Sequence, residues 1–162
     1  MIALESNGDV WGWGYNGYGQ LGLGTTNTEK SPKKITTLSK IVDVAVGDNH
    51  TLALNSDGNV YSFGLNNYGQ LGDRTNSTRT KPVIVTDGNG VPIKNIVKVE
   101  ANGNKSVALD ERGNVWIWGQ GYTRYATRIT SIKDVLDVSA EYAVKANGEV
   151  VALSNSQELQ NV

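Results

Sequence analysis

Residues 11–22 read WGWGYNGYGQLG, and residues 61–72 read YSFGLNNYGQLG. These two stretches start 50 residues apart, and around them residues 1–24 match residues 51–74 at 12 of 24 positions. A weaker copy begins at residue 106 and matches the corresponding part of the second copy at 6 of 15 positions. A period near 50 residues with strand-like sequence throughout is typical of β-propeller blades. The repeat therefore predicts an all-β chain built from propeller blades.

Each copy contains a short strand, a tight turn and a return strand. The turns are centred on dipeptides that tolerate positive φ, at Asn7-Gly8, Asp57-Gly58, Arg112-Gly113 and Asn147-Gly148. We predict return strands at 10–13, 60–63, 115–118 and 149–153. In the first three, two aromatic side chains lie two residues apart and share one face, while a valine takes the other: Val10, Val60 and Val115. Strands that are apolar on both faces must be covered on both sides, as blades in a propeller are.

The organisation predicted from the repeat is a single segment over residues 1–162. Its units are approximately 1–50, 51–105 and 106–142, with a partial unit over 143–162. The third unit is degenerate, because the chain after Gly119 reads QGYTRY and lacks the Gln-Leu-Gly of the first two units. The expected fold is a partial β-propeller of about three blades plus a terminal hairpin.

The stretches at 11–22 and 61–72 resemble the signature of the regulator of chromosome condensation repeat, and residues 47–54 (GDNHTLAL) resemble a second signature of that family. Pro32 and Pro82 fall where the family places a proline before the outer strand. Family members typically build seven-bladed propellers, so the resemblance implies about half of such a ring. Two explanations stay open: the chain is an excerpt of a longer, bacterial-type repeat protein, or two chains associate as a homodimer that completes a ring.

Composition excludes several classes of function. Glycine accounts for 19 of the 162 residues, which exceeds the roughly 7% of average proteins and fits many tight turns. The net charge of −1 provides no global field for nucleic acid or an anionic membrane, and no apolar run is long enough for a membrane span. With no cysteine and a single histidine, zinc sites and Cys–His or Ser–His nucleophile pairs are excluded. We predict a non-enzymatic protein without metal or cofactor, and without a nucleic-acid or membrane partner.

The most conspicuous side chains have structural interpretations. The resemblance implies that His50 is a signature residue that hydrogen-bonds backbone between strands, and the equivalent position in the next copy is Lys105, so there is no histidine array. Four tryptophans follow the register of the repeat, which favours packing between blades over a ligand platform: Trp11, Trp13, Trp116 and Trp118.

The variable loops of a propeller are the expected place of its function. We predict that a partner contacts loops around 23–33, 73–81 and 86–92. The candidate residues in them are Lys30, Lys33, Lys34, Arg74, Arg79, Lys81, Asp87 and Asn89. The basic residues could align into a basic rim, but Glu29 and Asp73 interrupt it, which favours an ordinary solvated surface.

The leading hypothesis is a scaffold for protein–protein interaction. One alternative is a carbohydrate or cell-wall binding module with Tyr15, Tyr18, Tyr68 or Tyr122 stacked on sugar rings; the recurrence of Tyr18 and Tyr68 in the repeat favours packing instead. A second alternative, a guanine-nucleotide exchange factor for a small GTPase, is implied by the resemblance alone. The Asn/Thr/Lys-rich loops and the absence of cysteine favour an extracellular or cell-surface protein over a cytoplasmic one.

Overall fold

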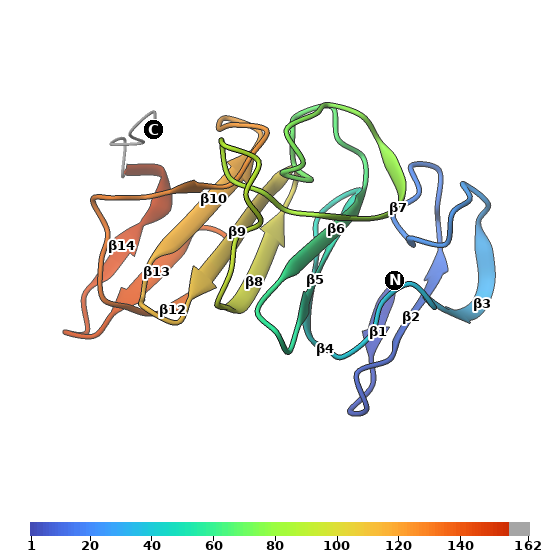
Figure 1. The fold of residues 1–162 in the computed structure, drawn as a ribbon, viewed down its shortest axis with the longest axis horizontal. Helices are drawn as coiled ribbons and strands as arrows, with labels where there is room; N and C mark the ends of the chain where they lie inside the picture. The colour runs from blue at the N-terminus through green and yellow to red at the C-terminus, as the bar shows by residue number, and fades with distance from the viewer. Residues whose placement is uncertain (156–162) are drawn as a thin grey trace.

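The computed structural model describes residues 1–155 and consists of antiparallel β-sheets placed side by side (Figure 1). The all-β prediction is confirmed, and only a short 3₁₀ helix, η1 (Leu153–Asn155), is present besides the strands of the described chain. The part of the fourth unit at residues 156–162 lies outside the described residues. The strands are β1 (Ile2–Leu4), β2 (Val10–Gly14), β3 (Glu29–Lys34), β4 (Ile41–Val46), β5 (His50–Asn55), β6 (Val60–Gly64), β7 (Arg79–Ile84), β8 (Ile96–Asn102), β9 (Lys105–Asp110), β10 (Val115–Gly119), β11 (Thr127–Arg128), β12 (Val135–Val138), β13 (Tyr142–Lys145) and β14 (Val150–Ala152).

The strands of the described chain form four sheets, two with four strands and two with three. The complete pattern is β4-β5-β6-β7 in the second sheet and β8-β9-β10-β11 in the third. The first sheet, β1-β2-β3, corresponds to the last three strands of this pattern, and the last sheet, β12-β13-β14, corresponds to the first three. The first strand of the second sheet, β4, contacts β8, the first strand of the third sheet, so these two strands lie on the inner side of the propeller. In the third sheet, the pairing between β10 and the outer strand β11 is short, as expected from the degenerate sequence of the third unit.

The predicted hairpins are present in all four sheets. Gly8, Gly58, Gly113 and Gly148 all have positive φ, between 82° and 89°. In the second sheet the register places Leu52 opposite Ser62 and Leu54 opposite Val60. A matching register recurs one repeat later, where Leu109 lies opposite Val115. The turn residues and the alternation of apolar side chains therefore specify the same pairing twice.

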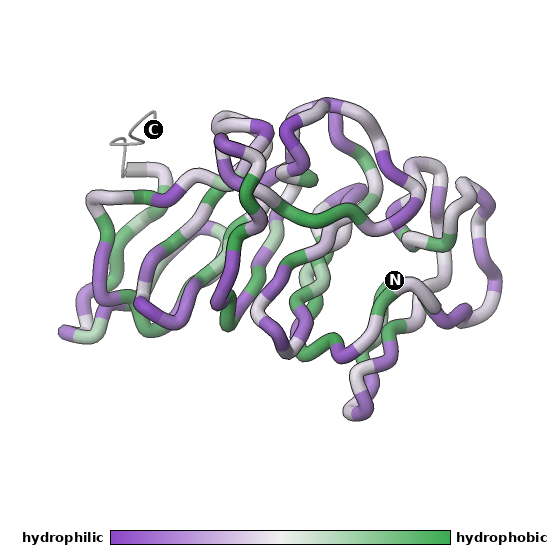
Figure 2. Tube along the Cα trace, viewed as in Figure 1, coloured by the Kyte–Doolittle hydropathy of each residue, from purple (hydrophilic) through white to green (hydrophobic). Residues whose placement is uncertain are grey.

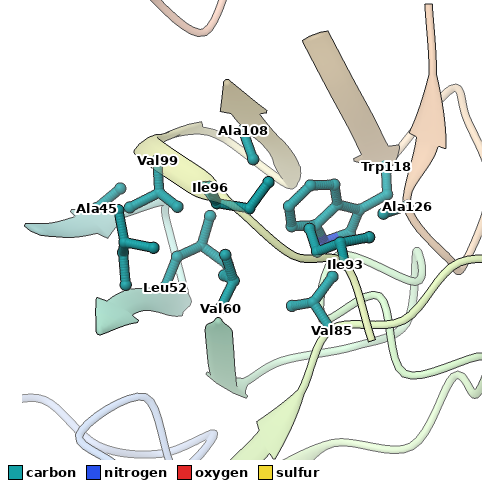
Figure 3. Close-up of a cluster of buried hydrophobic side chains, with 11 residues drawn as sticks. Ala45, Leu52, Val60, Val85, Ile93, Ile96, Val99, Ala108, Trp118 and Ala126 are labelled. Atoms are coloured by element: carbon teal, nitrogen blue, oxygen red, sulfur yellow. The ribbon is translucent and has the colours of Figure 1, made fainter. Parts of the chain in front are cut away.

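The core consists of the interfaces between neighbouring sheets. In the second and third sheets the aromatic face packs on the aliphatic face of the sheet before it: Phe63 packs with Val10 between the first and second sheets. Figure 3 shows the next interface, where Trp118 lies beside Ile93 and Val85 and belongs to the same buried cluster as Leu52 and Val60 of the second sheet. Phe63 and Trp118 are fully buried, and complete burial of a large apolar side chain stabilises a fold by about 1.5–3 kcal/mol. The predicted covering of both faces of each strand is confirmed for the second and third sheets.

The two end sheets each keep one face that no other sheet of the described chain covers. On the first sheet this is the aromatic face with Trp11 and Trp13, which are half-buried. On the last sheet it is the aliphatic face, where Tyr142, Val144 and Val150 are 54%, 39% and 61% exposed. One open face is thus aromatic and the other aliphatic, and faces of these two types pack against each other at the interfaces within the chain.

The position predicted for the two prolines is wrong. Pro32 and Pro82 lie within the outer strands β3 and β7 rather than before them. An outer strand has a neighbour on one side only, so a proline there removes no ladder hydrogen bond when its nitrogen faces away from the sheet. The predicted return strand at 149–153 is also shorter than expected, because Leu153 belongs to η1.

Candidate partner-binding face

The long loops of the molecule gather on one side of the sheets, at the top of Figure 1. We call this side the loop face; it comprises residues 15–28, 65–78, 86–92 and 120–126. The tight hairpin turns lie at the opposite end of the sheets (Figure 1). Hydrophilic residues are common in the loops and turns at both ends, and hydrophobic residues are concentrated in the inner and middle strands of the sheets, whereas the outer strand β3 is hydrophilic (Figure 2).

A buried asparagine organises each of the two longest loops. The Asn66 side chain is fully buried; its Nδ2 donates to the carbonyl oxygens of Thr75 and Ser77, each at 3.0 Å, and its Oδ1 accepts from the Leu71 amide at 3.0 Å. Asn16 repeats this arrangement in the first loop, with the carbonyl oxygens of Thr25 and Asn27 as acceptors. Sequence reasoning missed this role, although the recurrence of asparagine at a shift of 50 was a signal for it. The loops are therefore fixed in shape from within.

The recurring tyrosines point outward, so the expectation that they pack is wrong. Tyr18 is 39% exposed and Tyr68 is 47% exposed. The backbone amide of Tyr68 donates to Oε1 of the buried Gln70 at 2.9 Å, and Tyr18 makes the same bond to Gln20. The repeated feature is thus the amide–glutamine bond, and the tyrosine ring stays partly exposed.

Neighbouring loops meet through a glycine. Gly69 has a φ of +74°, and a Cβ at this position would lie 2.4 Å from the Cα of Arg124. The Arg74 amide donates to the Arg124 carbonyl oxygen at 2.8 Å, and Asp73 forms an isolated β-bridge with Tyr125. The loops of the second and third sheets are therefore in direct backbone contact, which requires glycine at position 69.

Most of the predicted basic residues do not lie in loops, so their assignment to loops is wrong. Lys30, Lys33 and Lys34 belong to β3, and Arg79 and Lys81 belong to β7. The reason is that the outer strands carry few apolar residues, so their sequence resembles a loop. Several of these cations are already paired, with distances of 2.9 Å for Lys33–Glu29, 2.7 Å for Lys34–Asp9 and 3.0 Å for Arg79–Asp73.

The structure does bring Arg74, Asp87 and Asn89 together on the loop face. Asp87 accepts hydrogen bonds from the amides of Asn89 and Val91, at 2.9 and 3.0 Å, and so closes a turn within the loop at 86–92. The Arg74 guanidinium covers Gly90 in this turn, where a Cβ would lie 2.7 Å from Nη1. The ring of Tyr125 lies beside Gly88 of the same turn. The loop at 86–92 thus packs beside the junction of the second and third sheets.

At this junction the surface is hollowed. The hollow has a volume of about 450 Å³ and lies between the loops that contain Tyr68 and Arg124. Asn67, Asn76, Gln120 and Tyr122 also line it. Burial and the nearby Glu141 carboxylate raise the pKa of the Tyr122 hydroxyl. Of the eight candidate residues predicted from the sequence, none lines this hollow.

His50 has a structural role, although its bond differs from the expected one. The ring is fully buried, and Nε2 lies 2.8 Å from the Ser106 hydroxyl rather than from a backbone group. The Ser106 hydroxyl donates to the Gln70 carbonyl oxygen, so His50 Nε2 carries the proton of their shared bond. Nδ1 is buried without a partner, and burial lowers the pKa of His50 to about 4. The histidine therefore joins the second and third sheets in its neutral form.

The tryptophans follow the predicted packing to different degrees. Trp118 is fully buried and donates from Nε1 to the Gln70 carbonyl oxygen at 2.9 Å, and Trp116 packs against the same core. Trp11 and Trp13 lie on the open face of the first sheet, and Nε1 of Trp11 is buried without a partner. Within residues 1–155 there is no cluster of three metal-ligating side chains, nor a helix suited to cross a bilayer.

The stacked antiparallel sheets and their 50-residue repeat define a segment of a β-propeller. The family model described as the regulator of chromosome condensation (RCC1) repeat matches residues 7–54 and 57–109, and a second model of the same repeat matches residues 41–70. The chain belongs to the RCC1 repeat family.

Similar proteins share this repeat over part of their length. Protein RCC2 homolog of Danio rerio is 39% identical over 120 residues, which cover 73% of this chain and 24% of the relative. E3 ubiquitin-protein ligase HERC2 of Homo sapiens is 30% identical over 123 residues, which cover 74% of this chain and 2% of the relative. The chain thus spans at most about a quarter of these two relatives.

Solved structures have the same fold. Human WBSCR16 superimposes with a TM-score of 0.78 at 21% identity, over 92% of this chain and 44% of that one. Prp20p of Saccharomyces cerevisiae superimposes with a TM-score of 0.72 at 23% identity, over 92% of this chain and 42% of that one. At these identities the likeness shows the fold alone, and the prediction of a partial RCC1-type propeller is confirmed.

Proposed function

We propose that this chain is a non-catalytic scaffold that binds a partner protein through the loop face. The observation that carries the proposal is the buried Asn66, which holds the loop at 65–78 in one shape while Tyr68 and Arg74 stay exposed on it. A loop that is ordered before binding loses little conformational entropy when it meets a partner. Tyrosine and arginine are also the residue types enriched at the energetic centres of protein interfaces.

Structural neighbours support a protein as the partner. Prp20p of Saccharomyces cerevisiae is described with binding properties to Gsp1p and histones, and yeast RCC1 (Prp20) was solved bound to Kap60. No residue of this chain is assigned to exchange activity on a GTPase, so that alternative stays a prediction, tested by nucleotide release from a purified small GTPase. Bacterial origin and an extracellular or cell-surface location also stay predictions.

The test uses a photo-crosslinking amino acid at one of two exposed positions. Tyr68 lies on the loop face, and Asp57 lies in a hairpin turn at the opposite end of the sheets. In cells that express the chain, we expect a discrete crosslinked protein from position 68 and none from position 57. Crosslinks from position 57 alone, or equally from both positions, would show that the loop face is not the interface.

A second candidate function, saccharide binding, is favoured by one observation. Tyr15 and Tyr18 are exposed and form an edge-to-face pair with ring centroids 6.2 Å apart, which leaves aromatic surface open to a sugar ring. The test is binding of the chain to a glycan array, with the Tyr15→Ala variant as the comparison. Binding that this variant loses would favour a saccharide, and the absence of any glycan signal would remove this candidate.

We also propose that two copies associate through their end sheets. The open aromatic face with Trp11 and Trp13 and the open aliphatic face with Val144 and Val150 are the two kinds of face that pack inside the chain. Contacts between unlike faces can close into a ring. The described chain has four sheets, so two copies would bring together eight sheets, whereas the ring expected from the family resemblance has seven blades.

A further inference from the structure

The hollow between the second and third sheets arises where the third unit departs from the repeat. The second unit connects its last two strands through residues 65–78, whereas the third unit uses only residues 120–126. The short connection leaves a space of about 450 Å³ beside the longer one, within the range of volumes of ligand sites. The departure from the repeat therefore creates a feature that the regular sequence pattern does not predict.

Two side-chain donor groups in this hollow, on Gln120 and Arg124, lie beside amide oxygens that already accept hydrogen bonds. The side-chain oxygen of Asn76 accepts from Arg124 Nη1 at 3.5 Å, and the side-chain oxygen of Gln120 accepts from Asn104 at 3.1 Å. The amide nitrogen of Asn76 donates to the Asn67 carbonyl oxygen. Within the described chain, the Gln120 side-chain nitrogen has no acceptor and the Arg124 guanidinium has no carboxylate. These two donor groups are therefore available to a ligand that supplies acceptor atoms.

Among the described residues that line the hollow, Arg124 is the only one that is charged at neutral pH, and the carboxylates near the hollow are already paired. Asp73 accepts from Arg79 at 3.0 Å and from the Thr75 hydroxyl at 2.6 Å. Glu141, which lies near Tyr122, is paired with Lys105 at 2.7 Å. Tyr68 adds an exposed ring at the rim. The site thus combines an unneutralised guanidinium with aromatic surface.

We propose that this hollow, the Arg124 pocket, binds the carboxylate of an aspartate or glutamate side chain on the partner protein. The proposal rests on the proposed scaffold function and names the chemistry of its partner. Arg124 forms the charge-assisted hydrogen bonds, Gln120 donates a further one, and Tyr68 packs on the stem of the acidic residue. A guanidinium without a carboxylate partner favours a negatively charged group over a neutral one. Tyrosine and arginine are residue types enriched at the energetic centres of protein interfaces, which favours a segment of a protein as the ligand.

The experiment is a selection from a random displayed-peptide library against the immobilised 162-residue chain. We expect the selected peptides to be enriched in Asp and Glu relative to the starting library. For a synthetic selected peptide, fluorescence polarisation should show about a tenfold or greater loss of affinity with Arg124→Gln. The matched control, Arg128→Gln, removes an exposed arginine outside the hollow and should bind as the parent chain does.

A double-mutant comparison separates the ion pair from a change in fold. Replacing the acidic residue of the peptide with its amide should cost as much affinity as Arg124→Gln, and the two changes together should cost no more than either one. Arg124→Lys should retain part of the affinity. Thermal unfolding of Arg124→Gln should match that of the parent chain.

The proposal is overturned in three ways. Selected peptides without enrichment in acidic residues, or with affinities that Arg124→Gln leaves unchanged, would show that the Arg124 pocket is not the anchor, while the scaffold function would stand. Acidic oligosaccharides that bind through Arg124, when acidic peptides do not, would make the pocket a saccharide site. A selection without any peptide binder would count against the scaffold function as well.

Discussion

Replacement of Asn66 by alanine should destabilise the chain far more than the same replacement of its neighbour Asn67. Asn66 is fully buried and makes three hydrogen bonds to backbone, to the Leu71 amide and to the carbonyl oxygens of Thr75 and Ser77. Each contributes about 0.5–1.5 kcal/mol net, and the Leu71 amide would be left buried without an acceptor. We therefore expect the free energy of unfolding to fall by about 3 kcal/mol for Asn66→Ala.

The control is Asn67→Ala, because Asn67 is exposed and uses its backbone oxygen, not its side chain, to accept from Asn76. Its free energy of unfolding should stay within about 0.5 kcal/mol of the parent value. Asn66→Asp sharpens the test: it keeps the acceptor for Leu71 but sets a carboxylate against two carbonyl oxygens and Asp73. At neutral pH it should be at least as destabilising as Asn66→Ala.

The assay is urea denaturation followed by tryptophan fluorescence, with the loss of stability read from the midpoint at an unchanged slope. Hydrogen exchange at the Leu71 amide should accelerate in Asn66→Ala and not in Asn67→Ala. Equal midpoints for the two alanine variants, together with equal protection of Leu71, would refute the view that the buried asparagine fixes the loop.

Three further predictions concern the sheet interfaces. Burial lowers the pKa of His50 to about 4 in the folded chain, whereas its value in the unfolded chain is 6.5. Between these pH values the folded chain therefore binds fewer protons than the unfolded chain. The free energy of unfolding should fall by up to about 3 kcal/mol as the pH drops from 6.5 to 4. His50→Gln should abolish most of this slope in denaturant titrations at the two pH values, and an unchanged slope would contradict the assignment. Gly69→Ala places a Cβ 2.4 Å from the Cα of Arg124, whereas Gly121→Ala is made at a similar positive φ with open space around the new Cβ. We expect calorimetry to show a loss of stability that is about 1–3 kcal/mol larger for Gly69→Ala than for Gly121→Ala. Equal losses of stability would refute the steric argument. Light scattering should give the mass of a dimer for the parent chain and of a monomer for Trp13→Glu, and a monomeric parent chain would rule out association through the end sheets.

The local part of the fold could be predicted from the sequence because it depends on short-range chemistry. Glycine in the turn dipeptides specifies the hairpins through positive φ, as at Gly58 and Gly113. The alternation of Val115 with Trp116 and Trp118 specifies two apolar faces, and these faces pack as expected. A repeat of 50 residues then implies stacked sheets, since a strand with two apolar faces is stable only between two neighbours.

Contacts between sheets could not be predicted in the same way. The repeat shows that a tyrosine recurs at positions 18 and 68. Recurrence alone does not show whether the tyrosine is retained because its ring is buried or because its backbone amide bonds to the glutamine two residues later. The outer strand β3 was interpreted as a loop because its exposed edge position places little demand on apolar side chains.

By itself, the sequence determined the family, the all-β class and the residue types at each sheet interface. All three depend on residues that lie close together within one repeat unit and recur in the next. Tertiary structure alone decided that Arg124 meets Asn76 and Gly69 across two sheets. Arg124 lies in the one described loop that has lost the repeat pattern, so no equivalent position indicates its neighbours. Its surroundings depend on how a shortened loop closes against the sheet before it, and this packing brings together residues 48 positions apart in the chain.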